Sequence, residues 1–392
     1  MNPSAGPVAT QSSLWNSSSV WRTSSVWESS SVWRQSSVWG QSSVWSQSSV
    51  WSQAGGLGHA LAARMAPLRA ALVQDLSPSQ ELPKQAAVGQ AGAWARWDES
   101  PRAQSLLLEA LGGLRVRAEP HAAVLECLCE QDVPSWKRLL RLQRPPETLF
   151  AQQLMALEAL LPLRDSRAVE IMEQDAGHIA YLLQAAQLPW ARLPRTLEFI
   201  RAALAVQQVC QMRLKQTLGC LRPIQYRASL LPLLDTPGHA SLPSGHAGET
   251  TLVAGLLNHW LRHHQATRTD LPTVLERLAI RIADNRVVAG LHFPVDNLAG
   301  RLLGHTVLQL VLAAVGAETE VGKQAQPIQP INAAFEPGKA GWPKGYPLQA
   351  DEQALDPCSQ PLCSAQPQSL PGLDWHDHRE LWSLVQAEWK LL

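Results

Sequence analysis

Three short segments of this chain concentrate basic and imidazole side chains between residues 215 and 296. They contain Lys215 and Arg222 in KQTLGCLRP, His246 in LPSGHAGE, and Arg286 and His292 in NRVVAGLHFPVD. Lysine and arginine carry fixed positive charge, and histidine exchanges protons near neutral pH. A fold that brings the three segments together would create a site that grips a tetrahedral oxyanion and does chemistry on it.

Apolar spacing predicts helices around the first two segments. The first helix is expected over 195–222, and it would place Lys215 and Arg222, seven residues apart, on one face. Ser244 is a good N-cap for a second helix, whose first amides would point at a bound anion. His246 then lies in the first turn of that helix, beside the anion.

The third segment joins two predicted helices. Residues 272–288 are expected to form a helix that carries Arg286 near its end, and Pro294 is expected to begin the next helix. His292 lies at the junction, and Asp296 is close enough in sequence to accept a hydrogen bond from one of its ring nitrogens. That bond would fix the tautomer and leave the other nitrogen of His292 free as a nucleophile.

In order and internal spacing, these segments resemble the type 2 phosphatidic acid phosphatase and vanadium haloperoxidase superfamily. The three motifs are Lys-six residues-Arg-Pro, then Pro-Ser-Gly-His, then Arg-five residues-His-three residues-Asp. The motifs span 215–296, and the homologous core is expected over about 166–318. One position departs from the pattern, because Asn285 stands where the superfamily usually has serine.

The resemblance implies a role for each motif residue. The residues implied to bind phosphate or vanadate are Lys215, Arg222, Arg286, Ser244 and the amide of Gly245. His292 is implied to attack phosphorus and form a phosphohistidine, or to ligate vanadium directly. Asp296 is implied to orient His292, and His246 is implied to be the acid that protonates the leaving group. Phosphoryl transfer needs mainly positioning and charge stabilisation, which cations supply.

Two chemistries remain open for this site. The favoured reading is an acid phosphatase-like phosphoric-ester hydrolase, which needs no cofactor and takes a small-molecule phosphoester. The alternative is a haloperoxidase that binds vanadate through His292 and oxidises bromide or chloride with hydrogen peroxide. His239, seven residues before His246, favours the alternative, because bromide-oxidising members of the superfamily have a histidine at the matching place. His239 is therefore a candidate halide or substrate modulator.

Composition excludes some classes of protein. With 33 basic and 33 acidic residues the formal charge is zero, which argues against nucleic-acid binding. The N-terminus lacks the basic and apolar regions of a signal peptide. No uninterrupted apolar run reaches the roughly 18 to 20 residues that cross a bilayer. Six cysteines fit a reducing compartment. These signs predict a soluble cytoplasmic protein without a membrane span, either monomeric or oligomeric.

The chain is expected to divide into five stretches and to be all-α, because no alternating strand pattern stands out in its middle. The stretches are a Ser/Val/Trp repeat (1–58), a helical region (59–165), the core (166–318), a loose Pro/Gln-rich segment (319–373) and an amphipathic helix (374–392). The core is expected to be a helical bundle of the superfamily's type.

The N-terminal repeat places tryptophan at every sixth residue. The repeating positions are Trp15, Trp21, Trp27, Trp33, Trp39, Trp45 and Trp51. On a helix this period scatters the rings, whereas on a strand it turns them all to one face. Disorder is favoured over a short β-solenoid and over extended segments that associate between chains. A remote functional alternative makes the repeat the working part of an interaction protein.

Overall fold

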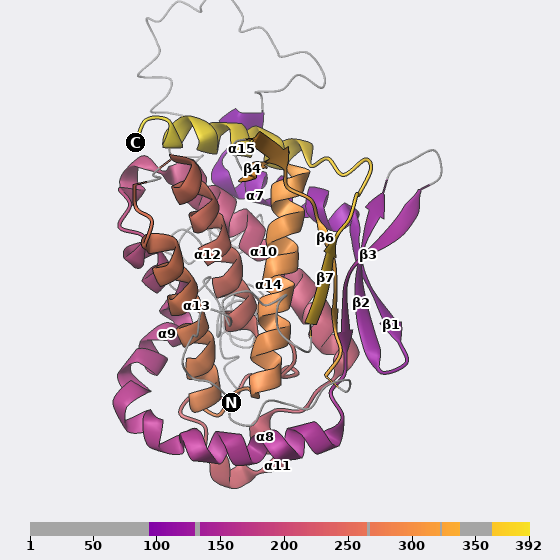
Figure 1. The fold of residues 1–392 in the computed structure, drawn as a ribbon, viewed down its shortest axis with the longest axis vertical. Helices are drawn as coiled ribbons and strands as arrows, with labels where there is room; N and C mark the ends of the chain where they lie inside the picture. The colour runs from indigo at the N-terminus through magenta and orange to yellow at the C-terminus, as the bar shows by residue number, and fades with distance from the viewer. Residues whose placement is uncertain (1–93, 130–133, 265–266, 322–323, 338–362) are drawn as a thin grey trace, which may run out of the picture. The chain divides into compact units, whose positions relative to one another are not determined.

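A computed structural model describes residues 94–129, 134–264, 267–321, 324–337 and 363–392 (Figure 1). The chain divides into two compact units, residues 1–101 and 102–392. Of the first unit the structure describes the 3-10 turn Trp94–Arg96 and the first residues of helix α7 (Glu99–Gly112). The tryptophan repeat lies outside the described residues, so the expectations for it stay predictions. All candidate site residues belong to the second unit.

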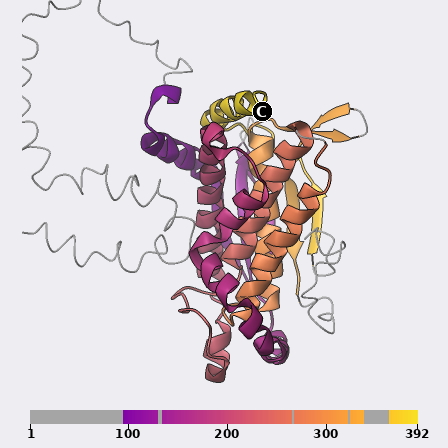
Figure 2. The ribbon, with the colours of Figure 1, turned by 90° about the vertical axis from the view of Figure 1, so that its left-hand side faces the viewer.

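Long helices form the body of the second unit (Figure 1). They are α9 (Arg164–Ala185), α10 (Pro194–Leu218), α12 (Gly245–His264), α13 (Leu271–Val288) and α14 (Pro294–Ala314). Two shorter helices, α8 (Glu147–Leu160) and α11 (Pro223–Tyr226), lie across one end of this bundle. Figure 2 shows α9, in magenta, beside α12 and α13, in orange, with which it is in contact.

The C-terminal helix α15 (His376–Trp389) lies across the opposite end of the bundle (Figure 1). Its aromatic side chains provide the attachment: the rings of Trp382 and Trp389 each stack on Trp260 of α12 with centroids 5.8 Å apart. The indole N–H of Trp389 also donates to Thr196 Oγ1 of α10 at 3.1 Å. Aromatic side chains bury a large apolar area, and these contacts hold α15 over this end of the core.

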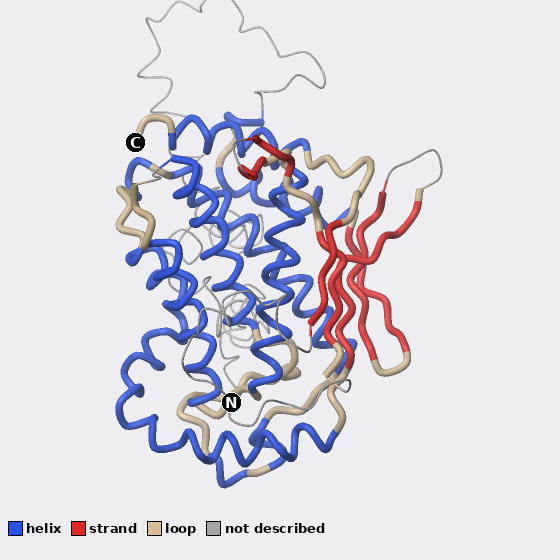
Figure 3. Tube along the Cα trace, viewed as in Figure 1, coloured by secondary structure: helices blue, strands red, loops and turns tan. Residues whose placement is uncertain are grey.

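The expected all-α class is wrong, because a five-stranded mixed sheet packs beside the bundle (Figure 3). Its strands are β1 (Leu114–Glu119), β2 (Ala122–Cys129), β3 (Ser135–Gln143), β6 (Ile331–Phe335) and β7 (Cys363–Pro367), in the order β1-β2-β3-β6-β7. The β3–β6 pair is parallel and the others are antiparallel. Strands β4 (Glu318–Val321) and β5 (Gln324–Pro327) form a separate two-stranded sheet.

The error has a physical origin in β2. Seven of its eight residues are buried, so Ala122–Cys129 is an almost continuous apolar run without alternation. Periodicity alone does not separate such a buried strand from a buried helix. Tertiary contacts decide, since β2 pairs with strands on both sides and packs against α10. The region 59–165 is therefore not uniformly helical, and the 319–373 segment contributes strands where the structure describes it.

Glycines let α12 and α14 approach each other closely. A Cβ added to Gly304 would lie 2.2 Å from the carbonyl oxygen of Gly248, and one on Gly300 would lie 2.3 Å from that of Ser244. Real Cβ atoms do not come so near to backbone oxygens, so only glycine fits at these crossing points. This contact sets the spacing between the helix that carries His246 and the helix that carries Asp296.

Candidate active site

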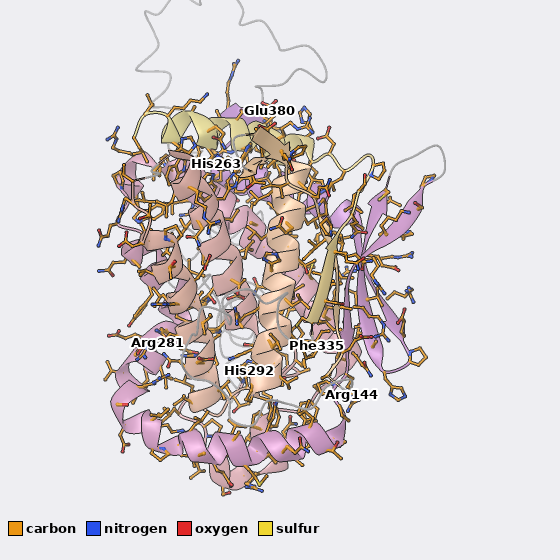
Figure 4. All side chains as sticks on the ribbon, in the orientation of Figure 1. Arg144, His263, Arg281, His292, Phe335 and Glu380 are labelled. Atoms are coloured by element: carbon orange, nitrogen blue, oxygen red, sulfur yellow. The ribbon has the colours of Figure 1, made fainter. Side chains whose placement is uncertain are left out.

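The site residues expected from the sequence come together at one end of the bundle, where α10 and α13 end and α12 and α14 begin. Figure 4 shows His292 at this end, near α8, and His263 toward the other end. All of the expected residues except the modulator candidate are buried: Lys215, Arg222, Ser244, Gly245, His246, Arg286, His292 and Asp296. His239 is half-buried. Such burial removes water and strengthens every charge interaction within the site.

His292 lies in the connection between α13 and α14. Its Nδ1 is 3.3 Å from Asp296 Oδ2 and 3.2 Å from Ser241 Oγ, and the Ser241 hydroxyl in turn donates to Asp296. The Phe293 N–H donates to the same carboxylate oxygen at 2.8 Å, which anchors Asp296 at the start of α14. With Nδ1 engaged in these contacts, Nε2 is the nitrogen of His292 that remains for a substrate.

Electrostatics keep the His292 ring neutral. Burial, followed by the nearby charges of Arg222 and Lys215, holds its pKa well below the ordinary value. Burial also raises the pKa of Asp296 to about 6, against hydrogen bonds from Ser241 and the Phe293 amide that oppose the rise. A neutral imidazole has a lone pair on its unprotonated nitrogen, which is the form that a nucleophile requires.

Lys215 lies in the last turn of α10, but Arg222 does not lie on that helix. Gly219 adopts φ +60° and ends α10 at Leu218, so the prediction of one helix over 195–222 with both cations on one face is wrong. Arg222 instead precedes α11. The two cations still approach the same loop, because Lys215 Nζ donates to the Ser241 carbonyl at 2.7 Å and Arg222 Nε to the His239 carbonyl at 2.9 Å.

Within the described residues, no ion pair joins Lys215 or Arg222 to a carboxylate. Their hydrogen-bond acceptors are neutral: Lys215 Nζ donates to the Ala240 carbonyl at 2.9 Å, and Arg222 Nη1 donates to the Leu291 carbonyl at 3.0 Å. Burial lowers the pKa of both groups, that of Arg222 to about 10. Buried cations without a direct ion-pair partner are costly, so a bound oxyanion would relieve the cost.

Arg286, near the end of α13, is held by α9. Its Nη2 donates to the Ile171 carbonyl at 2.7 Å, and its Nη1 lies 3.5 Å from Asp175 Oδ1. Its Nε is buried and has no hydrogen-bond partner in the described part of the chain. The neighbouring Asn285 donates to Gln174 Oε1 at 2.8 Å, so this departure from the superfamily pattern also serves the contact with α9.

The start of α12 presents Ser244, Gly245 and His246. Ser244 directly precedes the helix, but its hydroxyl has no partner among the described residues and does not cap it. A helix leaves its first amides without intrahelical acceptors. The Ser244 hydroxyl and the amides of the first turn are therefore further donors for an anion, beside Arg286 Nε.

His246 faces α9. Its Nε2 lies 3.2 Å from the carbonyl oxygens of both Gln174 and Asp175. Two acceptors at one nitrogen place a proton on Nε2, which leaves Nδ1 for proton exchange with a substrate. Burial, followed by electrostatic interactions with His178 and Arg286, holds the pKa of His246 well below its ordinary value. The negative charge of a bound phosphoester would oppose that shift.

His239 also belongs to the site. Its Nδ1 lies 3.1 Å from Arg222 Nη2, and burial together with Lys215 and Arg222 lowers its pKa to about 3. The structure thus places the candidate modulator against one of the expected anion-binding cations. His239 is uncharged at neutral pH and can act there as a hydrogen-bonding group.

Four site residues escaped the sequence reasoning: Ser241, Asp175, His178 and Glu249. Ser241 and Glu249 lie on either side of the PSGH motif, and an acid one turn after His246 on an apolar helix is a usable signal for Glu249. Asp175 and His178 belong to α9 and reach the site only through tertiary packing. No local pattern marked them.

A separate cavity of about 590 Å³ lies between α12, α13 and α14. Arg262 and His263, from the basic cluster near the end of α12, line it together with Arg301 and Glu276. None of the expected catalytic residues is among its lining residues. This cavity is therefore distinct from the oxyanion site.

The buried imidazoles predict that acid destabilises the protein. The folded-state pKa values of His239, His246 and His292 lie below the ordinary 6.5, so the unfolded chain binds more protons below that pH. The free energy of unfolding should fall as pH drops below about 6.5. Between pH 3.8 and about pH 6, the raised pKa of Asp296 makes the folded state more stable as pH falls, but this single carboxyl opposes three imidazoles.

The measurement is urea unfolding at about pH 7.5 and about pH 5 in buffer without phosphate. His239→Gln should reduce the difference between the two pH values, because it removes one of the three imidazoles. Equal stability at the two pH values in the wild-type protein would contradict the described burial of these rings.

Comparison with known proteins agrees with the motifs. Residues 199–320 match the family model described as PAP2 superfamily, which confirms the predicted resemblance for this segment. Decaprenylphosphoryl-5-phosphoribose phosphatase of Mycobacterium tuberculosis, in strains CDC 1551 and H37Rv, is 35% identical over 91 residues. That match covers 23% of this chain and 46% of the relative, so the chain spans about half the length of the curated relatives it matches.

A solved structure is also similar in part. It is a transmembrane PAP2 type phosphatidylglycerolphosphate phosphatase from Bacillus subtilis, 16% identical, with a TM-score of 0.35. The match covers 42% of this chain and 85% of that protein.

The cytoplasmic location expected from the sequence is corrected by the comparison with the mycobacterial relative, whose name carries a decaprenylphosphoryl group. The expectation of a soluble protein rested on the lack of an apolar run. Among the described residues, no helix combines the length and apolar character needed to cross a membrane. That finding assigns no compartment to the protein.

Proposed function

We propose that this protein hydrolyses phosphoric esters through a phosphohistidine on His292, since residues 199–320 match the PAP2 superfamily model. The observation that carries the proposal is the arrangement of His292: its Nδ1 is held at Asp296 and Ser241, and its neutral ring lies in the field of buried cations. A neutral nucleophile beside cations suits attack on an anionic phosphoryl group.

In the first step, Nε2 of His292 forms a bond to phosphorus as the bond from phosphorus to the ester oxygen breaks. In the complex with the phosphoester, His246 carries a second proton on Nδ1, and the leaving oxygen takes this proton and departs as an alcohol. Lys215, Arg222 and Arg286 stabilise the charge on the non-bridging oxygens throughout. The ring of His292 becomes positively charged when it is phosphorylated, and Asp296 lies where its carboxylate offsets that charge.

In the second step, water attacks phosphorus and the bond to His292 breaks. His246, now neutral, accepts a proton from the water, which returns both histidines to their starting states and releases inorganic phosphate. The exposed fractions of His292 and His246 are 5% and 7%, so little of either ring is open to solvent. A terminal phosphoryl group suits such a site, and we propose phosphomonoesters as the substrate class.

Vanadate-dependent halide oxidation is the second candidate, and the observation that favours it is His239 against Arg222. Vanadate is a tetrahedral oxyanion like phosphate, so the same cations and orphaned donors fit it, with His292 as its ligand. Bound vanadate would supply the activation of hydrogen peroxide toward halide. The chain's own residues would hold the anion in place and exchange protons at His246.

Orthovanadate separates the two candidates in one preparation. We expect it to inhibit hydrolysis of an aryl phosphate, because it occupies the phosphate site. With vanadate, bromide and peroxide present, the protein should oxidise no more bromide than the same reagents do without the protein. Vanadate-dependent bromide oxidation that is lost in His292→Ala would favour the haloperoxidase instead.

A further inference from the structure

Helix α9 supports His246 from two directions, although it precedes the segment that matches the family model. The carbonyl oxygens of Gln174 and Asp175 accept hydrogen bonds from Nε2 of His246. One turn further along, the ring of His178 lies against the ring of His246, with centroids 4.0 Å apart and planes tilted by 32°. The imidazole of His246 is thus confined at its edge and on one face.

His178 is itself fixed by a residue of α12. Its Nε2 is 2.7 Å from Glu249 Oε2, and both side chains are buried. Its Nδ1 has no hydrogen-bond partner within the described residues. A buried nitrogen without a partner is least costly when it carries no proton. The proton of His178 therefore lies on Nε2 and is donated to Glu249, which holds the ring plane.

We propose that His178, held by Glu249, is a positioning residue for His246. It keeps the ring in the orientation where Nε2–H donates to α9 and Nδ1 remains free to exchange a proton with the leaving oxygen. This inference rests on the proposed phosphatase function. It assigns a role to α9, which lies outside the matched segment and outside the three motifs.

The same three residues also suggest a metal site, because one ligand atom from each of His178, His246 and Glu249 lies within 4.8 Å of the others. The overlap of the two rings argues against it. An imidazole binds a metal in the plane of its ring, and two overlapping rings with planes tilted by 32° do not aim their nitrogens at one point. We therefore favour the positioning role and make zinc binding an outcome of the test.

Two double variants separate the ring of His178 from the buried hydrogen bond. Removing only one partner of the buried His178–Glu249 pair would destabilise the fold more than replacing both with apolar groups. Each change at His178 is therefore combined with Glu249→Leu. His178→Phe/Glu249→Leu keeps a flat ring against His246, and His178→Ala/Glu249→Leu does not. Glu249→Gln keeps an acceptor for His178. Glu276→Gln, on α13 at a hydrogen bond to Asn258, is the matched control.

The readout is the ratio of kcat/KM for an alkyl phosphate to kcat/KM for a nitrophenyl phosphate. Nitrophenolate leaves without an acid, whereas an alkoxide requires one, so the ratio reports the acid His246. The ratio is also independent of the fraction of protein that is folded. We expect His178→Ala/Glu249→Leu to lower it about 10-fold or more, part of the roughly 100- to 10,000-fold that a general acid supplies.

The variants that keep the ring or the acceptor, His178→Phe/Glu249→Leu and Glu249→Gln, should stay within about 3-fold of the wild-type ratio, as should Glu276→Gln. Nitrogen NMR of the histidine rings gives a second readout without substrate. It should show one tautomer of His246, with the proton on Nε2, in the wild type, and a mixture in His178→Ala/Glu249→Leu.

An unchanged ratio and a single tautomer in His178→Ala/Glu249→Leu would overturn the positioning role. So would inhibition of the wild type by zinc that Glu249→Leu abolishes, since that result assigns a metal site. A wild-type protein that hydrolyses neither phosphate ester contradicts the proposed function, and the tautomer measurement then still decides whether His178 orients His246.

Discussion

Replacing His292 with alanine is expected to lower kcat/KM for an aryl phosphate by about 1,000-fold or more. The proposed reaction passes through a bond between His292 Nε2 and phosphorus, and no other described imidazole has its Nδ1 at a carboxylate beside Lys215 and Arg222. The remaining activity would come from anion binding alone, as positioning and charge stabilisation persist without the nucleophile. Steady-state rates with nitrophenyl phosphate measure the effect.

The matched control is His376→Ala, which removes an imidazole from the exposed start of α15. It should leave kcat/KM unchanged within the error of the assay. Inorganic phosphate should still protect His292→Ala against thermal unfolding, because the cations remain. Activity of His292→Ala near the wild-type value would show that another residue attacks phosphorus.

Gly304→Ala is expected to reduce the free energy of unfolding by about 2 kcal/mol or more, as extra atoms in a tightly packed contact do. The new Cβ would meet the Gly248 carbonyl oxygen at 2.2 Å, and backbone does not rotate away as a side chain does. Relief of the clash requires α12 and α14 to separate. Since these helices carry His246 and Asp296, kcat/KM should fall as well. Urea unfolding and aryl phosphate hydrolysis measure the two effects.

Gly112→Ala is the control for this change. A Cβ at Gly112, at the end of α7, has no heavy atom within 4 Å, so the stability should change by no more than about 0.5 kcal/mol. If Gly304→Ala is as stable as the wild type, α12 and α14 do not touch as described. The account of what sets the site's spacing would then be wrong.

The sequence predicts which residues form the candidate site but not what surrounds them. The spacing of Lys215, Arg222, His246, Arg286 and His292 led to the superfamily resemblance, which the family comparison confirms. The prediction that one helix carries both Lys215 and Arg222 is wrong, because a positive φ at Gly219 ends α10 before Arg222. The two cations meet through the loop that follows, which periodicity does not reveal.

Tertiary contacts account for the remaining differences. The apolar run of β2 suits a buried strand and a buried helix equally, and only pairing with β1 and β3 decides between them. His178 reaches Glu249 across 71 residues of sequence, and neither residue belongs to a recognised motif. A single sequence gives no sign of contacts between such distant positions when each residue type is ordinary in its own helix.

A trapped phosphoryl group on His292 tests the central claim most directly. His246→Ala should form the intermediate from nitrophenyl phosphate, because this leaving group needs no acid, but should hydrolyse it slowly without the base. After quenching in alkali, where phosphohistidine survives, mass spectrometry should find one phosphoryl group on the peptide that contains His292. Turnover by His246→Ala with no phosphoryl group on that peptide, or with the group on another residue, would contradict the account.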